Sequence, residues 1–596
     1  MELKVLRVNL SDSSMEDVIF NDKTVEKFIG GRCLAVKILL DETPRGIDPL
    51  GPENKLIFLT GPVTGTPFPS SGRFHVSCKS PITGGIGDAD CGGDWGPELR
   101  FAGYDGIIFE GKAKKPVYLW INDGKAEIRD ASKYWGKTVN ETEDMLHAEL
   151  DEPKAKIVSI GPGGENQVLY AAIMNRKHRA AGRSGVGTVM GSKNLKAVVV
   201  RGSGRPPIAD LENMKATRKR ILAKLKENPT TGEGMPTFGT SVLVDATNGA
   251  GILPTYNFKT GVFDGADKIN AAAFQKEVYT KSCACWGCPV ACGKVSGDGE
   301  GPEYEAIALM GASCGIDDPH AITKAFHLCN NMGIDAISYG GTLACAMEMV
   351  EQGKIPTDKL NGEKIAFGST EALIDLVRKT ALREGFGDDL AMGSKRLAEK
   401  YGSPESAMHV KGLELPGYDP RGSKGQGLAY ATSPRGGCHV RSFPFAAEVA
   451  GWPIKLDPFT VEGKENITKA FQEIYAMDDS LVVCKLLGWA LDAQDLTDLL
   501  NAVTGWGWSE DDFMKAGERV WNIEKLYMLR EGFTRKDDTL PRRFLEEPMP
   551  EGPAQGETVD LETMLDAFYA LCGWDENGIP LEEKLDDLGL SEYAIG

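Results

Sequence analysis

Four cysteines within ten residues constrain this chain more than any other feature of its sequence. They are Cys283, Cys285, Cys288 and Cys292, in the run CACWGCPVAC. The last three are separated by two and then three residues, so one short loop can carry three thiolates to three irons of a [4Fe-4S] cube, with a distant fourth thiolate closing it. A structural zinc site usually combines two separate ligand pairs, and no second pair follows here. The spacing favours the iron–sulfur cluster over two alternatives, a zinc site and a catalytic or inert thiol group.

The length of the chain predicts several domains. A single hydrophobic core stops growing at about 250–300 residues, and this chain has 596. Its 41% hydrophobic and 26% charged residues are typical of a globular protein. The formal net charge of -19, with no basic stretch to offset it, would repel a phosphate backbone. We therefore expect no nucleic-acid partner.

The first residues, MELKVLRV, lack the basic and apolar regions and the cleavage site of a signal peptide. No run of 18 apolar residues is present, so we expect no membrane span. These features predict a cytoplasmic protein. In that reducing compartment the 13 cysteines favour metal binding over disulfides.

Two kinds of segment divide the chain. Short β-branched runs broken by Gly and Pro predict strands at 56–63, 73–78, 116–121, 156–160 and 195–200. Apolar residues at three- and four-residue spacing predict helices at 211–227, 321–332, 373–384, 394–401 and 495–503. Gly/Pro-rich runs at 201–207 and 415–422 mark the two boundaries between these regions. We predict a multidomain α+β fold with a sheet-rich N-terminal domain, 1–207, and two mainly α-helical domains, 208–415 and 416–596.

Several short motifs follow one another in a fixed order. Besides the cysteine loop they are GR at 72–73, SIGPGGEN at 159–166, HRAAG at 178–182, GPEYE at 301–305, YDPRG at 418–422, RGGCH at 435–439 and FLEEPMP at 544–550. Together they resemble the tungsten-containing aldehyde:ferredoxin oxidoreductase family along nearly the whole chain. The resemblance implies an oxidoreductase that converts aldehydes to carboxylates, with its cofactor where three domains meet.

The resemblance also implies how the cofactor is bound. One tungsten would be held by the dithiolenes of two pyranopterins (molybdopterin), without a protein side chain on the metal. Each pterin would face an acidic motif, whose carboxylate accepts hydrogen bonds from ring N–H groups. The first motif has Asn330 in place of the family's first Asp and keeps Asp335; the second contains Asp479 and the fourth cluster ligand, Cys484. In the second motif Val482 stands where Gly is usual.

Phosphate groups on the pterins require positive charge and a divalent ion between them. By resemblance Arg73 and Arg179 contact the pterins. A bridging Mg²⁺ would bind the backbone carbonyls of Asp90 and Ala180. Asp90 replaces the family's usual Asn, a change that a backbone ligand tolerates.

The candidate catalytic residues are Glu305 and His439. Aldehyde oxidation adds oxygen at the carbonyl carbon and removes two electrons, so the protein must polarise the carbonyl and move protons. A Glu and a His suit these tasks, and the resemblance assigns them to these two positions. Glu303 is a nearby competitor, and either glutamate could instead solvate the start of a helix.

Electrons are expected to leave through the cluster to ferredoxin or to a partner iron–sulfur subunit. Some homodimeric members of the family hold a metal at the subunit interface with Glu-x-x-His, whereas the matching stretch here runs from Lys324 to His327. Lysine cannot replace a carboxylate ligand, so we expect this metal to be absent. The chain would then form a homodimer by other contacts or join a larger heteromeric complex.

Two other functions are compatible with these motifs. One is a related tungsten enzyme subunit that reduces an acyl or aromatic thioester at low potential, because the same cofactor supports several substrates. The other is an electron-relay subunit that holds only the cluster. The retention of Glu305, His439 and both acidic motifs argues against the relay, which needs only cysteines. Molybdenum could replace tungsten, since no protein ligand distinguishes them.

Overall fold

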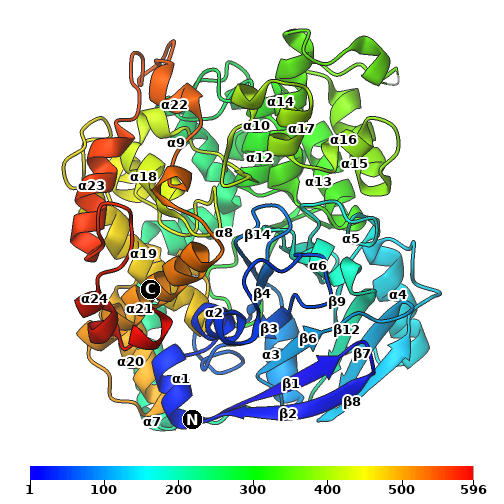
Figure 1. Ribbon diagram of the computed structural model, residues 1–596, viewed down its shortest axis with the longest axis vertical. Coiled ribbons are helices and arrows are strands. Elements are labelled where there is room, and N and C mark those ends of the chain that lie inside the picture. The colour runs from blue at the N-terminus through cyan, green and yellow to red at the C-terminus, as the bar shows by residue number, and fades with distance from the viewer. Residues whose placement is uncertain (298, 361, 595–596) are drawn as a thin grey trace.

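The computed structural model describes residues 1–297, 299–360 and 362–594. Two six-stranded sheets occupy the N-terminal region, drawn in blue and cyan in Figure 1. The first has the order β2-β1-β6-β3-β4-β5, with β1 Leu3–Asn9, β2 Ser14–Phe20, β3 Leu56–Leu59, β4 Phe74–Lys79, β5 Ile86–Cys91 and β6 Gly106–Glu110. The second has the order β11-β10-β9-β12-β7-β8, with β7 Val117–Asn122, β8 Lys125–Asp130, β9 Lys156–Ser159, β10 Ile173–Asn175, β11 Arg179–Ala181 and β12 Leu195–Arg201.

The alternation of side chains along the strands explains this layering. In β1, Leu6 and Val8 belong to a core that both sheets share, whereas Leu3 and Val5 face the opposite side. That opposite side packs against α2 (Gly31–Glu42) and α21 (Glu510–Arg530). Because successive side chains point to opposite faces, a strand such as β1 with apolar residues on both faces must be buried on both. The first sheet is therefore covered by the second sheet on one face and by helices on the other.

The rest of the chain is mainly helical (Figure 1). Its longer helices are α7 Leu211–Glu227, α13 Pro319–Met332, α14 Ala336–Glu351, α15 Thr370–Leu382, α19 Lys464–Leu481, α20 Ala493–Thr504, α21 and α23 Leu561–Cys572. Shorter ones include α9 Leu243–Gly249, α12 Tyr304–Met310, α17 Ser394–Lys400 and α18 Lys424–Thr432. One hydrophobic cluster contains residues from both sides of position 415, such as Leu376 and Phe568. Helix α7 packs against α20, so it adjoins the C-terminal helices.

The predicted fold class is confirmed. Each predicted strand segment coincides with a strand, namely β3, β4, β7, β9 and β12, and each predicted helix segment with a helix, namely α7, α13, α15, α17 and α20. Within the described ranges, no helix combines the length and the apolar composition that crossing a membrane requires.

The two sheets meet along their edge strands, β5 and β11, which lie side by side. An edge strand has backbone N–H and C=O groups that no neighbouring strand uses. Asp90 lies on β5, and Arg179 and Ala180 lie on β11. The fold thus presents backbone carbonyls and side chains together at one junction with the helical region.

Candidate active site

The cysteine loop connects two strands of a small sheet formed by β13 (Lys281–Cys283), β14 (Gly293–Ser296) and β15 (Gly299–Glu300). Cys283 ends β13 and pairs with Gly293 in β14, so the hairpin holds the loop 284–292 at both ends. Cys285, Cys288 and Cys292 lie in this loop. The Ser70 hydroxyl donates to the Cys288 Sγ at 3.3 Å, which ties the loop to the N-terminal region.

Cys484 reaches the same place from the end of α19. The helix ends at Leu481, and Val482 adopts a left-handed conformation with φ of 59°. This conformation is rare for a β-branched residue, which explains why glycine is usual at this position in the family. All four predicted cluster ligands carry free thiols. Among the described residues, no three His, Cys, Asp or Glu side chains are grouped to hold one metal ion.

Every site residue predicted from the sequence lines one cavity of about 380 Å³. Its walls hold the four cysteines Cys285, Cys288, Cys292 and Cys484, Arg73 directly before β4, the edge-strand residues Asp90, Arg179 and Ala180, the acidic-motif residues Asn330, Asp335 and Asp479, and the catalytic candidates Glu305 and His439. The structure therefore brings together residues that lie more than 400 positions apart in the sequence. Gly92 is part of the same wall, where a Cβ atom would come within 2.8 Å of the Cys285 Sγ.

Two arginines project from the edge-strand side. The Arg73 Nη2 donates to the Asp90 carbonyl oxygen at 3.0 Å. Arg179 pairs with Glu300 at 2.5 Å and with Glu303 at 2.9 Å, and its buried Nε has no hydrogen-bond partner among the described residues. Both guanidinium groups lie where phosphates could bind, and the orphaned Nε is a donor that a bound anion would satisfy.

The first acidic motif joins two helices. Asn330 lies in the last turn of α13, and no residue that the structure describes forms a hydrogen bond with its buried Nδ2. Asp335 is the N-cap of α14, where its carboxylate accepts from the backbone N–H groups of Ile337 and Ser338. The helix-capping role of Asp335 thus coexists with its place in the cavity wall, because a carboxylate accepts several hydrogen bonds.

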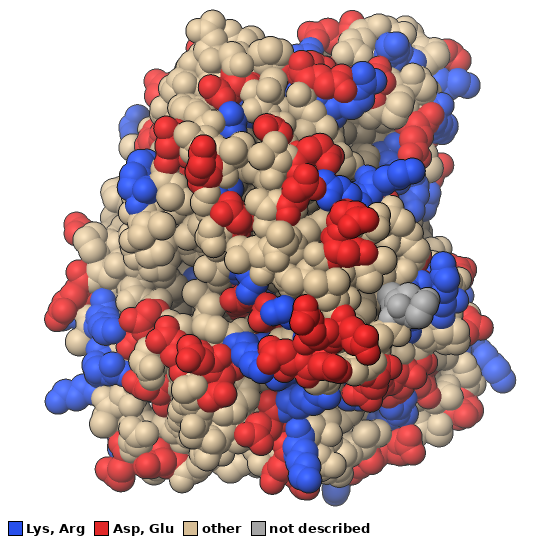
Figure 2. All heavy atoms as spheres, turned by 60° about the vertical axis from the view of Figure 1, so that its left-hand side comes forward, with Lys and Arg blue, Asp and Glu red and all other residues tan. Residues whose placement is uncertain are grey.

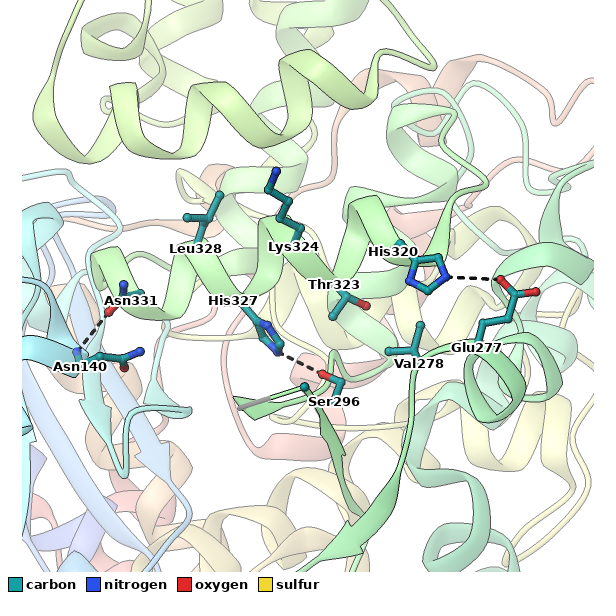
Figure 3. A pocket seen from close by; sticks show the side chains of 11 residues that line it. Asn140, Glu277, Val278, Ser296, His320, Thr323, Lys324, His327, Leu328 and Asn331 are labelled. Carbon is teal, nitrogen blue, oxygen red and sulfur yellow. Dashed lines mark hydrogen bonds and ion pairs between the residues drawn. The ribbon is translucent and has the colours of Figure 1, made fainter.

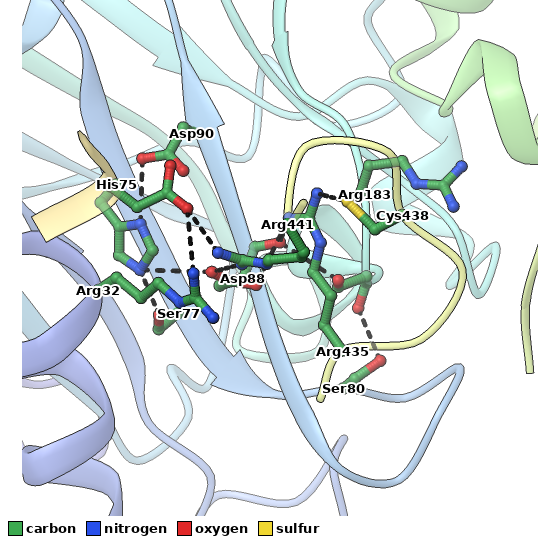
Figure 4. Close-up of polar contacts among 12 residues, drawn as sticks. Arg32, His75, Ser77, Ser80, Asp88, Asp90, Arg183, Arg435, Cys438 and Arg441 are labelled. Carbon is green, nitrogen blue, oxygen red and sulfur yellow. Dashed lines mark hydrogen bonds and ion pairs between the residues drawn. The ribbon is translucent and has the colours of Figure 1, made fainter. Parts of the chain in front are cut away.

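The second acidic motif is held by cations. The Asp479 carboxylate accepts from the Arg441 Nη1 at 2.6 Å, forms an ion pair with Lys485, and lies 3.5 Å from the Arg32 Nη1. Arg441 also contacts Asp88 on β5, as Figure 4 shows. Arg441, Asp479 and Asp88 are almost fully buried, so this network is screened little by solvent.

Asp88 and Asp90 lie beside His75 in the same network (Figure 4). The His75 Nδ1 is 3.1 Å from the Asp90 Oδ1, and its Nε2 is 2.7 Å from the Ser77 hydroxyl. The positive charges of Arg441 and Arg435 outweigh burial and hold the pKa of the Asp88 carboxyl below its usual range. A chain of buried charges therefore supports the second motif and the strand that carries Asp90.

Glu305 and His439 face each other. Glu305, in the first turn of α12, accepts from the Gly417 N–H through its Oε2 at 2.8 Å. Its Oε1 lies 3.3 Å from the His439 Nε2 but has no partner with hydrogen-bond geometry. Burial raises the pKa of Glu305 to about 7. Burial, followed by the charges of Arg183 and Arg435, lowers the pKa of His439 to about 3, so the imidazole is neutral at physiological pH.

A second cavity of about 120 Å³ opens on the same pair. Aromatic and aliphatic side chains form most of its lining, among them Tyr418, Phe443 and Trp489. It shares Glu305 and His439 with the larger cavity. A small organic molecule in this chamber would have an apolar wall around it and the Glu–His pair at one end.

Lys324 and His327 line a separate pocket of about 500 Å³, which shares no lining residue with the cavity of the predicted site. Figure 3 shows these two side chains pointing in different directions from α13. The His327 Nε2 lies 3.1 Å from the Ser296 hydroxyl and 3.0 Å from the Glu300 carbonyl oxygen. The expected absence of an interfacial metal stays a prediction.

Sequence reasoning missed several charged residues of this site. Arg183 donates to the carbonyl oxygens of Glu414 and Gly437 and so connects the end of β11 to the loop that carries His439. Arg435, which donates to the Asp88 carbonyl oxygen, and Arg441, which donates to the Asp479 carboxylate, were missed as well. Their positions in the sequence could have indicated them. Arg183 directly follows the motif at 178–182, Arg435 begins the motif at 435–439, and Arg441 lies two residues after its end.

Comparison with known protein families identifies the family of this chain. The family model described as aldehyde ferredoxin oxidoreductase, N-terminal domain, matches residues 5–202, and the one described as domains 2 and 3 matches residues 216–590. The chain belongs to the aldehyde ferredoxin oxidoreductase family. This confirms the resemblance drawn from the motifs.

Individual members of the aldehyde ferredoxin oxidoreductase family and their relatives show how far the likeness extends. The tungsten-containing aldehyde ferredoxin oxidoreductase of Pyrococcus furiosus is 48% identical over 598 aligned positions, which cover 99% of each chain. The aliphatic sulfonate oxidoreductase, WOR-like subunit, of the same organism is 34% identical over 99% of this chain and 97% of its own. Among solved structures, the active-site complex BamBC of benzoyl coenzyme A reductase, bound to 1,5-dienoyl-CoA, has a TM-score of 0.86 and 26% identity, covering 100% of this chain and 98% of that one.

Proposed function

We propose that this chain is a tungsten-dependent aldehyde ferredoxin oxidoreductase that oxidises aldehydes to carboxylates. The observation that carries the proposal is the meeting of four thiols, two arginines, two acidic motifs and the Glu305–His439 pair in one cavity. The 48% identity to a tungsten-containing aldehyde ferredoxin oxidoreductase over the full chain supports the same reaction.

The residues present fit the proposed cofactors. Buried donors without partners, the Arg179 Nε, the Asn330 Nδ2 and the Arg435 Nε, line the cavity and suit a ligand with many acceptors, such as two pterin phosphates. Backbone carbonyls of the edge-strand residues Asp90 and Ala180 suit a bridging Mg²⁺. Four thiols that share one cavity without forming a single-ion site suit a [4Fe-4S] cluster better than zinc.

The protein's own groups can manage the protons of the reaction. An aldehyde and one water yield a carboxylate, two electrons and three protons. When bound, the tungsten pterin would accept the two electrons and the cluster would pass them on. Neutral His439 can donate a hydrogen bond to the aldehyde oxygen. Glu305, which lies 3.3 Å from His439, can accept one of the three released protons once its carboxyl is ionised. The apolar second cavity would exclude water from the rest of the substrate.

Reduction of a thioester is the second candidate, since the structural neighbour is a benzoyl coenzyme A reductase complex. Its identity to this chain is 26%, against 48% for the aldehyde enzyme. The identities therefore favour aldehyde oxidation, and an electron relay without chemistry would leave the Glu305–His439 pair without a role.

The domains, the electron acceptor and the assembly of the protein are part of the same proposal. We propose domain boundaries near 207 and 415, ferredoxin or an iron–sulfur subunit as electron acceptor, and assembly as a homodimer or a heteromeric complex. The gap between the two family matches, from 202 to 216, supports the first boundary. A cytoplasmic location remains a prediction.

Metal analysis and an aldehyde assay test the proposal together. In anaerobically purified protein we expect about one tungsten and about four irons per chain, and aldehyde-dependent reduction of benzyl viologen. Iron without tungsten or molybdenum would favour the relay, and zinc alone would refute both tungsten functions. Activity with an aromatic thioester and reduced viologen, but not with aldehydes, would establish the second candidate.

Glu305→Gln tests the catalytic assignment. We expect the rate with aldehyde to fall by about 10²–10⁴-fold while tungsten and iron contents stay unchanged. In the wild type, kcat should rise with pH through about 7 as the Glu305 carboxyl ionises. Retained activity in the variant, or a wild-type rate that is flat between about pH 6 and pH 8, would remove Glu305 from the mechanism.

A further inference from the structure

The cysteine loop reaches the protein surface. Ala284, Gly287 and Pro289 are exposed, and Cys285 and Cys288 between them are only partly buried. Electrons held by a cluster in this loop would therefore have their shortest way out of the protein through this surface. A partner that receives them must approach here.

Two arginines flank the loop on its N-terminal-domain side. The Arg176 Nη1 donates to the Ala284 carbonyl oxygen at 3.3 Å. The Arg205 guanidinium lies 4.6 Å from the centre of the Phe101 ring, which in turn contacts the loop residue Trp286 with ring centres 6.0 Å apart. Arg176 is half-buried and Arg205 is exposed, so both charges face solvent.

Two more cations complete the surroundings of the loop. The Arg218 Nε donates to the Pro67 carbonyl oxygen at 2.8 Å, in the segment whose Ser70 N–H donates to the Gly287 carbonyl oxygen at 3.1 Å. Lys281 is exposed at the start of β13, directly before the loop. We name Arg176, Arg205, Arg218 and Lys281 the cationic collar.

None of the collar's charges forms an ion pair with a carboxylate in the part of the chain that the structure describes. The carboxylates of Glu300 and Glu303 near the cysteines are both held by Arg179. The whole chain has a formal net charge of -19, and the face in Figure 2 carries groups of carboxylates with Lys and Arg between them. Among these residues, the four collar cations and Arg179 stand against the two carboxylates, whereas the whole chain is negative.

We propose that the cationic collar is the docking surface for an acidic, ferredoxin-type iron–sulfur protein that takes electrons from the cluster. This inference rests on the proposed function, because it requires a cluster in the loop. Unpaired cations attract an acidic partner over a distance and orient it, which raises the association rate more than the affinity. On a chain of net negative charge, they would bring such a partner to the loop and away from other faces.

The test compares two electron acceptors with one holoenzyme. The triple variant Arg176→Glu, Arg205→Glu and Arg218→Glu should lower kcat/KM for an acidic ferredoxin by at least about tenfold. Its aldehyde-dependent rate with benzyl viologen, a small acceptor that needs no docking surface, should stay unchanged. Rising ionic strength should slow ferredoxin reduction by the wild type and have little effect on the variant.

Arg45→Glu is the matched control. Arg45 is an exposed arginine near Gly532, it forms no ion pair with another described residue, and it is remote from the loop in sequence. It should leave ferredoxin reduction unchanged. If the triple variant does not fold, the single variant Arg205→Glu, at an exposed linker position, should lower kcat/KM about threefold.

Equal ferredoxin kinetics for the collar variants and Arg45→Glu would overturn the proposal. So would a wild type that reduces viologen but not ferredoxin, a result that would indicate a permanently bound iron–sulfur subunit. A wild type that fails to reduce even viologen with aldehydes would instead refute the proposed function.

Discussion

The two acidic motifs place similar carboxylates at opposite ends of helices. Asp335 is the N-cap of α14, and Asp479 lies in the last turn of α19. A helix carries partial positive charge at its N-terminus and partial negative charge at its C-terminus. The first carboxylate is therefore stabilised by its helix, and the second is destabilised by its own.

This difference explains why the partners of the two motifs differ. Asp335 accepts two backbone N–H groups, and its nearest cation, the Arg183 Nη1, is 3.5 Å away. In the described part of the chain, no backbone N–H group donates to Asp479, and its carboxylate is surrounded by Arg441, Lys485 and Arg32. A helix N-terminus thus replaces the side-chain cations that a helix C-terminus must recruit from distant parts of the chain.

Arg441→Met should show the difference most strongly. Removing this cation leaves Asp88 and Asp479 buried with too little positive charge, and breaking a buried pair typically costs about 3–5 kcal/mol. We therefore expect the free energy of unfolding of the holoenzyme to fall by about 3–5 kcal/mol. The fall would be measured as a lower urea midpoint in circular dichroism.

The matched control for this prediction is Arg183→Met at the first motif. Asp335 keeps its two backbone donors in that variant, so the loss of stability should be smaller than for Arg441→Met. Equal losses in the two variants would show that the helix end contributes nothing to the stability of Asp335.

Asp478→Asn sharpens the comparison at the unfavourable helix end. Asp478 lies beside Asp479, its Oδ1 has no hydrogen-bond partner, and burial raises the pKa of its carboxyl from 3.8 to about 7. Because the folded state binds this proton more tightly, its contribution is fully present below about pH 4 and is lost as pH rises to about 7.

The variant should therefore lose part of the wild type's decline in stability with pH. The rise in the pKa from 3.8 to about 7 corresponds to about 4 kcal/mol at pH 8. We expect Asp478→Asn to be more stable than the wild type by about this free energy of unfolding at pH 8, and so to have the higher urea midpoint. Parallel midpoint curves for the two proteins between about pH 4 and pH 8 would contradict the assigned cause.

Local patterns predicted much of the fold and of the cavity wall. Strands such as β12 and helices such as α7 follow from short-range periodicity, which the sequence contains directly. Asp335 and Asp479 were assigned by resemblance, because they match the acidic motifs of the family. Glu305 and His439 were found by resemblance, and their 3.3 Å approach could not have been derived from residues 134 positions apart.

The cationic partners could not be predicted because they depend on tertiary contacts. Arg441 contacts Asp88 across 353 positions, and Arg32 contacts Glu524 across 492. No sequence periodicity links such residues, and an isolated arginine is usually a surface residue. A buried carboxylate at a helix C-terminus would have been a usable signal, since it requires cations from somewhere in the fold.

Asp335→Asn should give the smallest change in stability and so isolates the role of the first motif toward the cofactor. Asparagine caps a helix about as well as aspartate, so the free energy of unfolding from urea titration should change by no more than about 0.5 kcal/mol. Asp479→Asn, the same substitution at the other helix end, should cost more, because Lys485 and Arg441 then lose a buried partner. If Asp335 also binds a pterin, its variant should lose tungsten while it keeps the wild-type midpoint. A fall in midpoint as large as that of Asp479→Asn would mean that the N-terminus of α14 does not satisfy this carboxylate, and the contrast between the motifs would fail.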